Sequence, residues 1–139
     1  MERNSSGSVV STEMLLEVRI PKAVARQGNA YQKIEKRVGD FAMAGAGASL
    51  VLDETGKVTH AGIGLTGVGP TAIHAKKAAA SLVGQPADEG HLQQASELAR
   101  EESVPFSDLR GPAEYKRAMA GVLTHRVLTR AVARAKGGA

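Results

Sequence analysis

The chain has 139 residues and a mass of 14.4 kDa, which fits one ordinary domain that buries a single core. It contains no cysteine, so disulfides, thiol nucleophiles and thiolate metal sites are excluded for this chain alone. The net charge is +4, and no apolar run approaches the roughly 20 residues of a spanning helix. We therefore expect a soluble domain without a membrane span, compatible with the cytoplasm.

Much of the positive charge lies in the last third of the chain, on a segment with helical periodicity. Such charge can be a solvated helix face, a nucleic-acid surface or a face for an acidic partner subunit. No aromatic residues interleave with these cations, as binding to single-stranded nucleic acid would require. A solvated face without a nucleic-acid partner is favoured, and the acidic partner stays open. The cations are Lys116, Arg117, Arg126, Arg130, Arg134 and Lys136.

The N-terminal segment divides into a leader and a first predicted strand. Residues 1–12 are rich in Ser and predict a flexible leader, with the domain taking residues 13–139. Within Met14–Ile20, apolar residues alternate with Glu17 and Arg19, which predicts a half-buried strand. Pro21 ends it because proline cannot donate to a strand ladder.

Ala30–Arg37 is predicted to form a second strand with an unusually polar face. Tyr31, Lys33, Glu35 and Arg37 fall on one side of it, opposite a mixed side. Gly39-Asp40 predicts a turn in which the Asp side chain accepts a backbone hydrogen bond.

The next elements predict a hairpin. Phe41–Leu52 is an apolar run of small residues, typical of a strand that another element approaches closely. Residues 53–56 predict a turn, with Gly56 in the left-handed conformation, and Val58–Leu65 returns antiparallel. The glycine-rich segment Thr66–Thr71 lacks the spacing and lysine of a phosphate-binding loop, so we favour a structural turn over a phosphate site.

Three helices are expected after the sheet. Ala75–Val83 ends at Gly84, and Asp88 caps a helix that includes His91–Glu102. Pro112 begins the longest helix, Ala113–Lys136, which ends at Gly137. Its predicted apolar stripe is Tyr115, Met119, Val122, Leu123, Val127, Leu128 and Ala131. The fold class is therefore α+β, an antiparallel sheet of about four strands followed by three helices on one face.

Catalytic or metal-binding groups are not indicated by the residue pattern. His60, His74, His91 and His125 lie on different predicted elements, without metal-ligand spacing or a triad arrangement. Each is expected to be a surface or strand-edge histidine. The pattern alone thus predicts an α+β domain without an assigned function.

Three motifs resemble a known family. They are AYQKIEKRVGDFAMAGAG, IGLTGVGPT and RGPAEYKRAMAGVLTHR, in this order along the chain. They resemble the C-terminal domain of the FAD-binding medium subunit of molybdenum hydroxylases, closest to aerobic carbon monoxide dehydrogenase. The resemblance covers about Leu15 to Lys136.

The resemblance implies a role in electron transfer. In that family a molybdopterin large subunit oxidises the substrate, an iron–sulfur small subunit relays electrons, and FAD in the medium subunit passes them to an external acceptor. The family binds FAD mainly through an earlier, glycine-rich part, so FAD is expected to be shared with that FAD-binding part and not held by this chain alone. The chain is then no catalyst by itself.

The resemblance also suggests cofactor-binding residues. Tyr31 matches a family tyrosine near the isoalloxazine ring, and Lys33 could place a cation beside the flavin that favours its reduced anion. Arg37 and Asp40 are weaker candidates, and an ion pair that positions the turn is the slightly favoured interpretation for them. Arg110, Glu114, Tyr115 and Arg117 are expected to cap and dock the last helix.

A second class of function stays open from the sequence. The same fold could serve as a stand-alone, non-catalytic interaction module that forms a homo-oligomer or binds a partner without redox chemistry.

Overall fold

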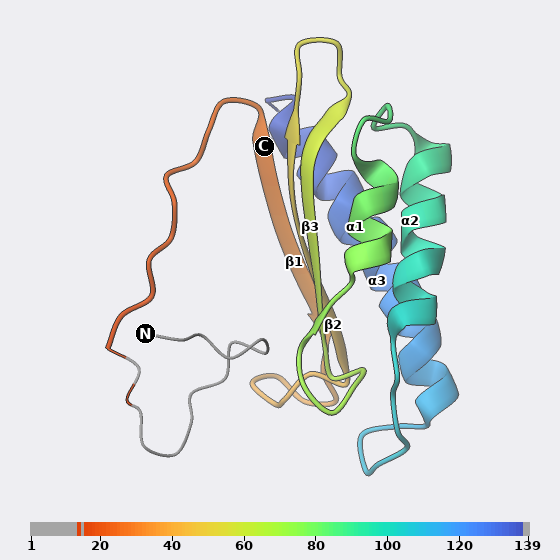
Figure 1. Cartoon of the computed structure of the whole chain (residues 1–139). Helices are drawn as coiled ribbons and strands as arrows, with labels where there is room; N and C mark the ends of the chain where they lie inside the picture. Colours follow the sequence, from red (N-terminus) through yellow and green to blue (C-terminus); the bar gives the residue numbers. More distant parts are fainter. Residues whose placement is uncertain (1–13, 15, 138–139) are drawn as a thin grey trace.

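The computed structural model describes residue 14 and residues 16–137, and Figure 1 shows a sheet with helices on one side only. The strands are β1 (Gln27–Ile34), β2 (Ala44–Leu52), β3 (Val58–Thr66) and β4 (Ile73–His74), antiparallel neighbours in the order β1-β2-β3-β4. The helices are α1 (Lys76–Leu82), α2 (Glu89–Glu102) and α3 (Ala113–Ala135). The predicted α+β class, with its helices late in the sequence, is confirmed.

The predicted β2–β3 turn and the predicted cap of α2 form as expected, whereas Pro112, expected at the first helical position, is the residue before α3 and has an extended backbone. In the β2–β3 turn, Asp53 Oδ1 accepts hydrogen bonds from the backbone amides of Thr55 and Lys57 at 2.8 and 2.9 Å, and Gly56 has a φ of 85°. At α2, Asp88 Oδ1 accepts from the backbone amide of His91 at 3.1 Å. These contacts satisfy backbone donors that a turn or a helix start otherwise leaves unpaired. Because the partners are close in sequence, the local sequence was enough to predict them.

The helices cover one face of the sheet. Helix α3 packs against β1 and β2, α1 packs against β3, and α2 packs against α1 and α3. The core combines alanine with larger aliphatic residues from both strands and helices, among them Ala44, Ala46, Ala48, Leu50, Leu123, Val127 and Leu128. At Gly28 in β1 the helix comes so close that an added Cβ would lie 1.8 Å from the carbonyl oxygen of Ala131.

Strand boundaries differ from those expected. Strand β1 begins three residues before Ala30 because Gln27 pairs with Val51 of β2.

The expected strand at Met14–Ile20 is wrong over the described residues. Residues 16–20 are extended but pair with no other strand, and the side chains of Leu16, Val18 and Ile20 are 73–85% exposed. The fourth strand is instead β4, which at two residues is too short to show a period. Residues 1–12, the expected leader, lie outside the described residues.

Helix α3 buries a different set of side chains from the one expected. Leu123, Val127, Leu128 and Ala131 are buried as predicted, whereas Tyr115 and Val122 are more than a third exposed. Lys116, expected on a solvated face, is buried with only 3% of its side chain exposed. The other five cations of that set are exposed. The helix turns Lys116 toward the preceding loop, where an acidic side chain offsets its charge.

Candidate functional site

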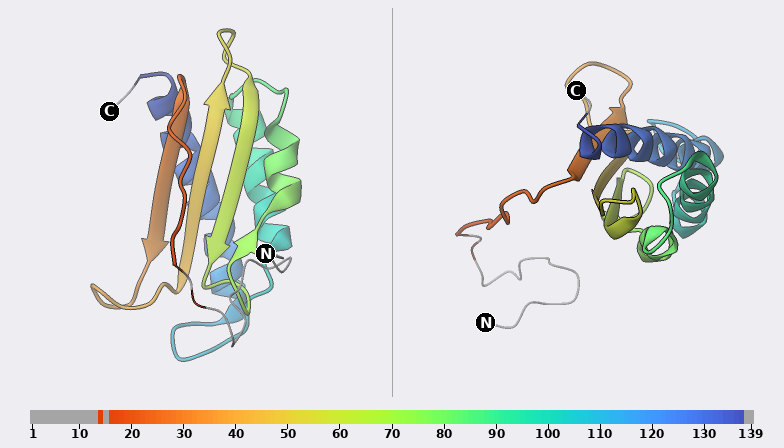
Figure 2. Two further views of the ribbon diagram at one scale, coloured as in Figure 1. Left: turned by 60° about the vertical axis from the view of Figure 1, so that its left-hand side comes forward. Right: turned by 90° about the horizontal axis from the view of Figure 1, so that it is seen from above.

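The second face of the sheet is open and lined largely by glycine. The strand register places Tyr31, Gly47, Gly64 and His74 in one row across β1 to β4. An added Cβ at Gly62 or Gly64 would meet no atom within 4 Å. Figure 2 shows that, among the residues described, no helix covers this face. The sheet therefore presents a flat, polar-edged surface.

Tyr31 lies on this open face with its ring along the sheet. It is 58% exposed. A Cβ built at Gly47 would lie 3.5 Å from the Tyr31 ring, and one at Gly45 would lie 3.1 Å from the phenolic oxygen. The missing side chains at these glycines let the ring lie low over β2. One ring face is thus supported by the sheet backbone, and the other is available to a planar partner.

Lys33 lies on the same face as Tyr31 and is held from two sides. Its ammonium forms an ion pair with Glu35 and donates a hydrogen bond to the backbone oxygen of Asp40 at 3.1 Å. The hydrogen bond to Glu35 raises the pKa of Lys33 above its usual value, so the side chain is cationic at any ordinary pH. The structure thereby holds an ammonium group, paired with a carboxylate, on the sheet face that also carries the Tyr31 ring.

The turn after β1 is structural, as predicted. Gly39 has a φ of 85°, and the backbone amide of Asp40 donates to Arg37 O at 3.0 Å. The Asp40 carboxylate accepts from the backbone amide of Phe41 at 2.7 Å. The expected ion pair of Asp40 with Arg37 does not form; the cation near Asp40 is Arg110, at 3.9 Å between Nη2 and Oδ1. The site therefore joins Tyr31, Lys33 and Asp40, while Arg37 is exposed apart from them.

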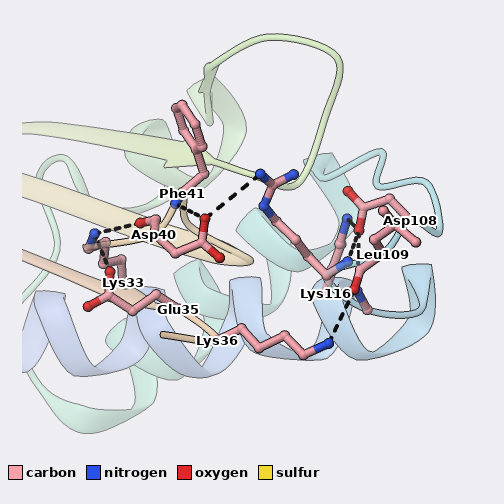
Figure 3. A network of polar contacts seen from close by, with 10 residues as sticks. Lys33, Glu35, Lys36, Asp40, Phe41, Asp108, Leu109 and Lys116 are labelled. Carbon is pink, nitrogen blue, oxygen red and sulfur yellow. Dashed lines mark hydrogen bonds and ion pairs between the residues drawn. The ribbon is translucent and has the colours of Figure 1, made fainter. Parts of the chain in front are cut away.

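Sequence reasoning missed a second group of polar residues that reaches this turn (Figure 3). Lys116 Nζ lies 2.8 Å from Asp108 Oδ1, and the guanidinium of Arg110 lies 5.4 Å from the ring centroid of Phe41. The motif Arg110–Arg117 was the sequence signal for this group, but from the sequence it was expected only to cap and dock the last helix. No periodicity reveals that a loop 70 residues away in sequence lies beside the β1–β2 turn.

The residues present fit one end of FAD. The open ring face of Tyr31 and the fixed cation of Lys33 match a planar ring that gains negative charge on reduction. The glycine-rich loop at Gly67 does not match the pyrophosphate end of FAD. Carbonyl oxygens face this loop, since a Cβ at Gly67 would lie within 3 Å of those of Ala42 and Met43. Carbonyl oxygens repel phosphate, so the loop that includes Gly67 is a structural turn and offers no cradle of amide donors there.

Other features of the described residues carry no cofactor site. The four histidines stay on separate elements, with His91 and His125 each 2.8 Å from one carboxylate, of Asp88 and Glu89 respectively. No group of three metal-ligating side chains occurs in this part of the chain. A hollow of about 490 Å³ lies between α2 and α3 on the helical side of the molecule. Over the same residues, no helix combines the length and apolar character needed to cross a bilayer.

Curated relatives match most of this chain. The carbon monoxide dehydrogenase medium chain of Afipia carboxidovorans is 44% identical over 124 residues, 89% of this chain and 43% of that protein. The 6-hydroxypseudooxynicotine dehydrogenase complex subunit alpha of Paenarthrobacter nicotinovorans is 30% identical over 129 residues, 93% of this chain and 44% of that protein. The chain thus spans less than half the length of these relatives.

Solved structures and a family model agree with these relatives. Reconstituted CO dehydrogenase from Oligotropha carboxidovorans superimposes with a TM-score of 0.77 at 43% identity, covering 83% of this chain and 40% of that one. Quinoline 2-oxidoreductase from Pseudomonas putida 86 gives a TM-score of 0.72 at 32% identity, covering 78% of this chain and 38% of that one. The family model described as CO dehydrogenase flavoprotein C-terminal domain matches residues 29–131. The chain therefore belongs to the CO dehydrogenase flavoprotein C-terminal domain family.

Proposed function

We propose that this chain acts as the C-terminal part of the flavoprotein subunit of a molybdenum hydroxylase. In this role its open sheet face encloses one side of the isoalloxazine ring of FAD, and the assembly passes electrons from iron–sulfur clusters to an external acceptor. The observation that carries the proposal is the pairing of Tyr31 and Lys33 on a sheet face that no helix of the described chain covers.

Each proposed site residue has a distinct task. FAD, when bound, supplies the redox chemistry. Tyr31 offers a flat aromatic surface that limits access of water to the ring, and Lys33 offers a positive charge that stabilises negative charge on the reduced ring. Asp40 holds Lys33 through its backbone oxygen. Arg37 is exposed at the turn, where its charge adds to the field around the same surface.

The partners follow from the length and the names of the relatives. Because this chain corresponds to about two fifths of a medium chain, we expect it to act with an FAD-binding part of that subunit, an iron–sulfur small subunit and a molybdopterin large subunit. Relatives named for carbon monoxide, 6-hydroxypseudooxynicotine and caffeine share this domain. Such different substrates imply that the choice of substrate is made outside this domain.

Co-expression with an FAD-binding part tests the proposal. We expect a yellow complex when the chain is produced together with the FAD-binding part of a carbon monoxide dehydrogenase medium chain. Tyr31→Ala and Lys33→Ala should change the absorption spectrum or the midpoint potential of the flavin, and Lys33→Ala should make reduction harder. Val83→Ala, an exposed change just after α1 and outside both the sheet and the loops beside Lys33, serves as the control. Unchanged flavin spectra and potentials in both site variants would remove the site assignment.

The same experiment decides the second class of function. If the chain forms a stable homo-oligomer or binds a partner but never joins an FAD-binding part, it is an interaction module. The feature that favours this reading is the set of exposed apolar side chains Leu16, Val18 and Ile20. Size-exclusion chromatography with light scattering, on the chain alone and on the mixture, separates the two functions.

A further inference from the structure

Two loops that are far apart in sequence meet beside Lys33. Loop 35–43 joins β1 to β2, and loop 103–112 joins α2 to α3. Arg110 reaches across from the second loop, with its Nη2 3.9 Å from Asp40 Oδ1 and its guanidinium 5.4 Å from the centroid of the Phe41 ring. Lys36 Nζ donates to the backbone oxygen of Leu109 at 3.5 Å, also across the gap (Figure 3). The contacts are a long ion pair, a cation–π contact and a hydrogen bond from an ammonium, and together they join the two loops at three points.

A buried ion pair fixes the conformation of loop 103–112. Lys116 Nζ lies 2.8 Å from Asp108 Oδ1 and donates to the backbone oxygen of Phe106 at 3.1 Å. The same Asp108 oxygen accepts from the backbone amides of Arg110 and Gly111 at 2.8 and 3.2 Å. One carboxylate therefore ties the first turn of α3 to the backbone of Arg110.

Placing an ammonium group in this position is costly for a loop anchor alone. Lys116 is almost completely buried, and a buried charge stabilises a fold only when its geometry and hydrogen bonds offset the loss of water. An apolar side chain of similar length would fill the same space without that cost. The ion pair gives Asp108 a defined position. Asp108 in turn accepts from the backbone amides of Arg110 and Gly111, so the backbone of Arg110 is also fixed.

We propose that Lys116, Asp108 and Arg110 are positioning residues for the Lys33 site. In this arrangement Lys116 holds Asp108, Asp108 holds the backbone of Arg110, and Arg110 holds Asp40 and Phe41. Asp40 in turn accepts from Lys33 through its backbone oxygen. The inference rests on the proposed function for what the Lys33 charge acts on, while the coupling of the two loops is a property of this chain alone.

Hydrogen exchange on the isolated full chain tests the coupling of the loops. In Arg110→Met, which keeps a long side chain without the charge, we expect the amides of Phe41 and Met43 to exchange about tenfold faster. Arg110→Lys should restore part of the protection, because it keeps a cation near Asp40. Arg117→Met is the matched control, since Arg117 is exposed one residue beyond Lys116. Equal exchange in Arg110→Met and the parent chain would overturn the proposal.

The flavin complex tests whether Arg110 affects the flavin through the position of Lys33. Arg110→Met should shift the flavin midpoint potential in the same direction as Lys33→Ala, and the shift should vanish when Lys33→Ala is already present. A shift of full size in the Lys33→Ala background would overturn the route through Lys33. If Lys33→Ala leaves the potential unchanged while exchange still responds to Arg110→Met, the proposed role of Lys33 fails and the coupling of the loops stands.

Discussion

The two faces of this sheet use small residues for opposite purposes. On the covered face, Ala44, Ala46 and Ala48 of β2 are buried, and Gly28 of β1 lets α3 approach to van der Waals contact. On the open face, Gly47 and its neighbours leave a shallow surface over which the Tyr31 ring lies. A small residue in a strand therefore allows close helix packing on one side of this sheet and leaves exposed space on the other.

The largest expected effect distinguishes a glycine on the covered face of the sheet from a glycine on the open face. Gly28→Ala should destabilise the chain by about 4 kcal/mol or prevent folding, because the new Cβ collides with helix backbone that no side-chain rotation can clear. Gly62→Ala should change the free energy of unfolding by less than about 0.5 kcal/mol, since its Cβ enters open space. Urea unfolding followed by circular dichroism measures both. Similar losses at the two positions would show that the open face is filled in solution.

A second pair of variants compares larger side chains. Leu50 is fully buried on the covered face, so Leu50→Ala should cost about 3 kcal/mol through lost burial and the cavity it leaves. Tyr31→Ala on the open face should cost under about 1 kcal/mol in the isolated chain. In the flavin complex the order of importance should reverse, with Tyr31→Ala altering the flavin and Leu50→Ala leaving the spectrum of the folded fraction unchanged. Thermal melts and flavin absorption on the same samples provide the measurement.

The smallest expected effect concerns the end of the sheet where loop 103–112 meets the β1–β2 turn. The hydrogen bond from Lys116 holds the pKa of Asp108 below its ordinary value of about 3.9. A depressed folded pKa contributes stability above the unfolded pKa, and this contribution is lost as the pH falls through the folded value. The free energy of unfolding should therefore fall below about pH 4 and fall less steeply in Asp108→Asn.

The control for that experiment is Glu54→Gln, which removes an exposed carboxylate from the β2–β3 turn. Asp53 and Asp88 also have lowered pKa values, through hydrogen bonds from Thr55 and from the backbone amide of His91 respectively. Some acid sensitivity should thus persist in Asp108→Asn. An unchanged pH slope in this variant would mean that Asp108 gains nothing from Lys116 in solution.

Local signals in the sequence predicted most of the fold. The Asp53–Gly56 turn, the Asp88 cap and the stop at Gly84 depend on neighbours in sequence, and all three form. The period-two pattern at residues 16–20 predicted an extended backbone, which the structure has, and a sheet partner, which the described residues do not supply. Alternation specifies that a strand has two unlike faces but does not specify what pairs with it.

The candidate site was predictable only in part. The placement of Tyr31 and Lys33 on one exposed face followed from alternation in β1, whereas their assignment to a flavin followed from family resemblance and stays a prediction. The contacts of Asp40 with Arg110 and of Lys116 with Asp108 could not be derived. They join residues whose proximity depends on how α3 crosses the sheet, and a charged residue in a basic helix is ordinarily solvated.

The sequence by itself determined the α+β class, the order of β1 to β3 and of the three helices, several turns and caps, and the two unlike faces of β1. These features depend on backbone preferences and on interactions within a few residues. Only the tertiary structure decided that Lys116 is buried, that Gly28 is where α3 meets the sheet, and that loop 103–112 reaches Asp40. The physical reason is that burial and charge pairing depend on which distant segments pack together, and neither composition nor periodicity contains that information.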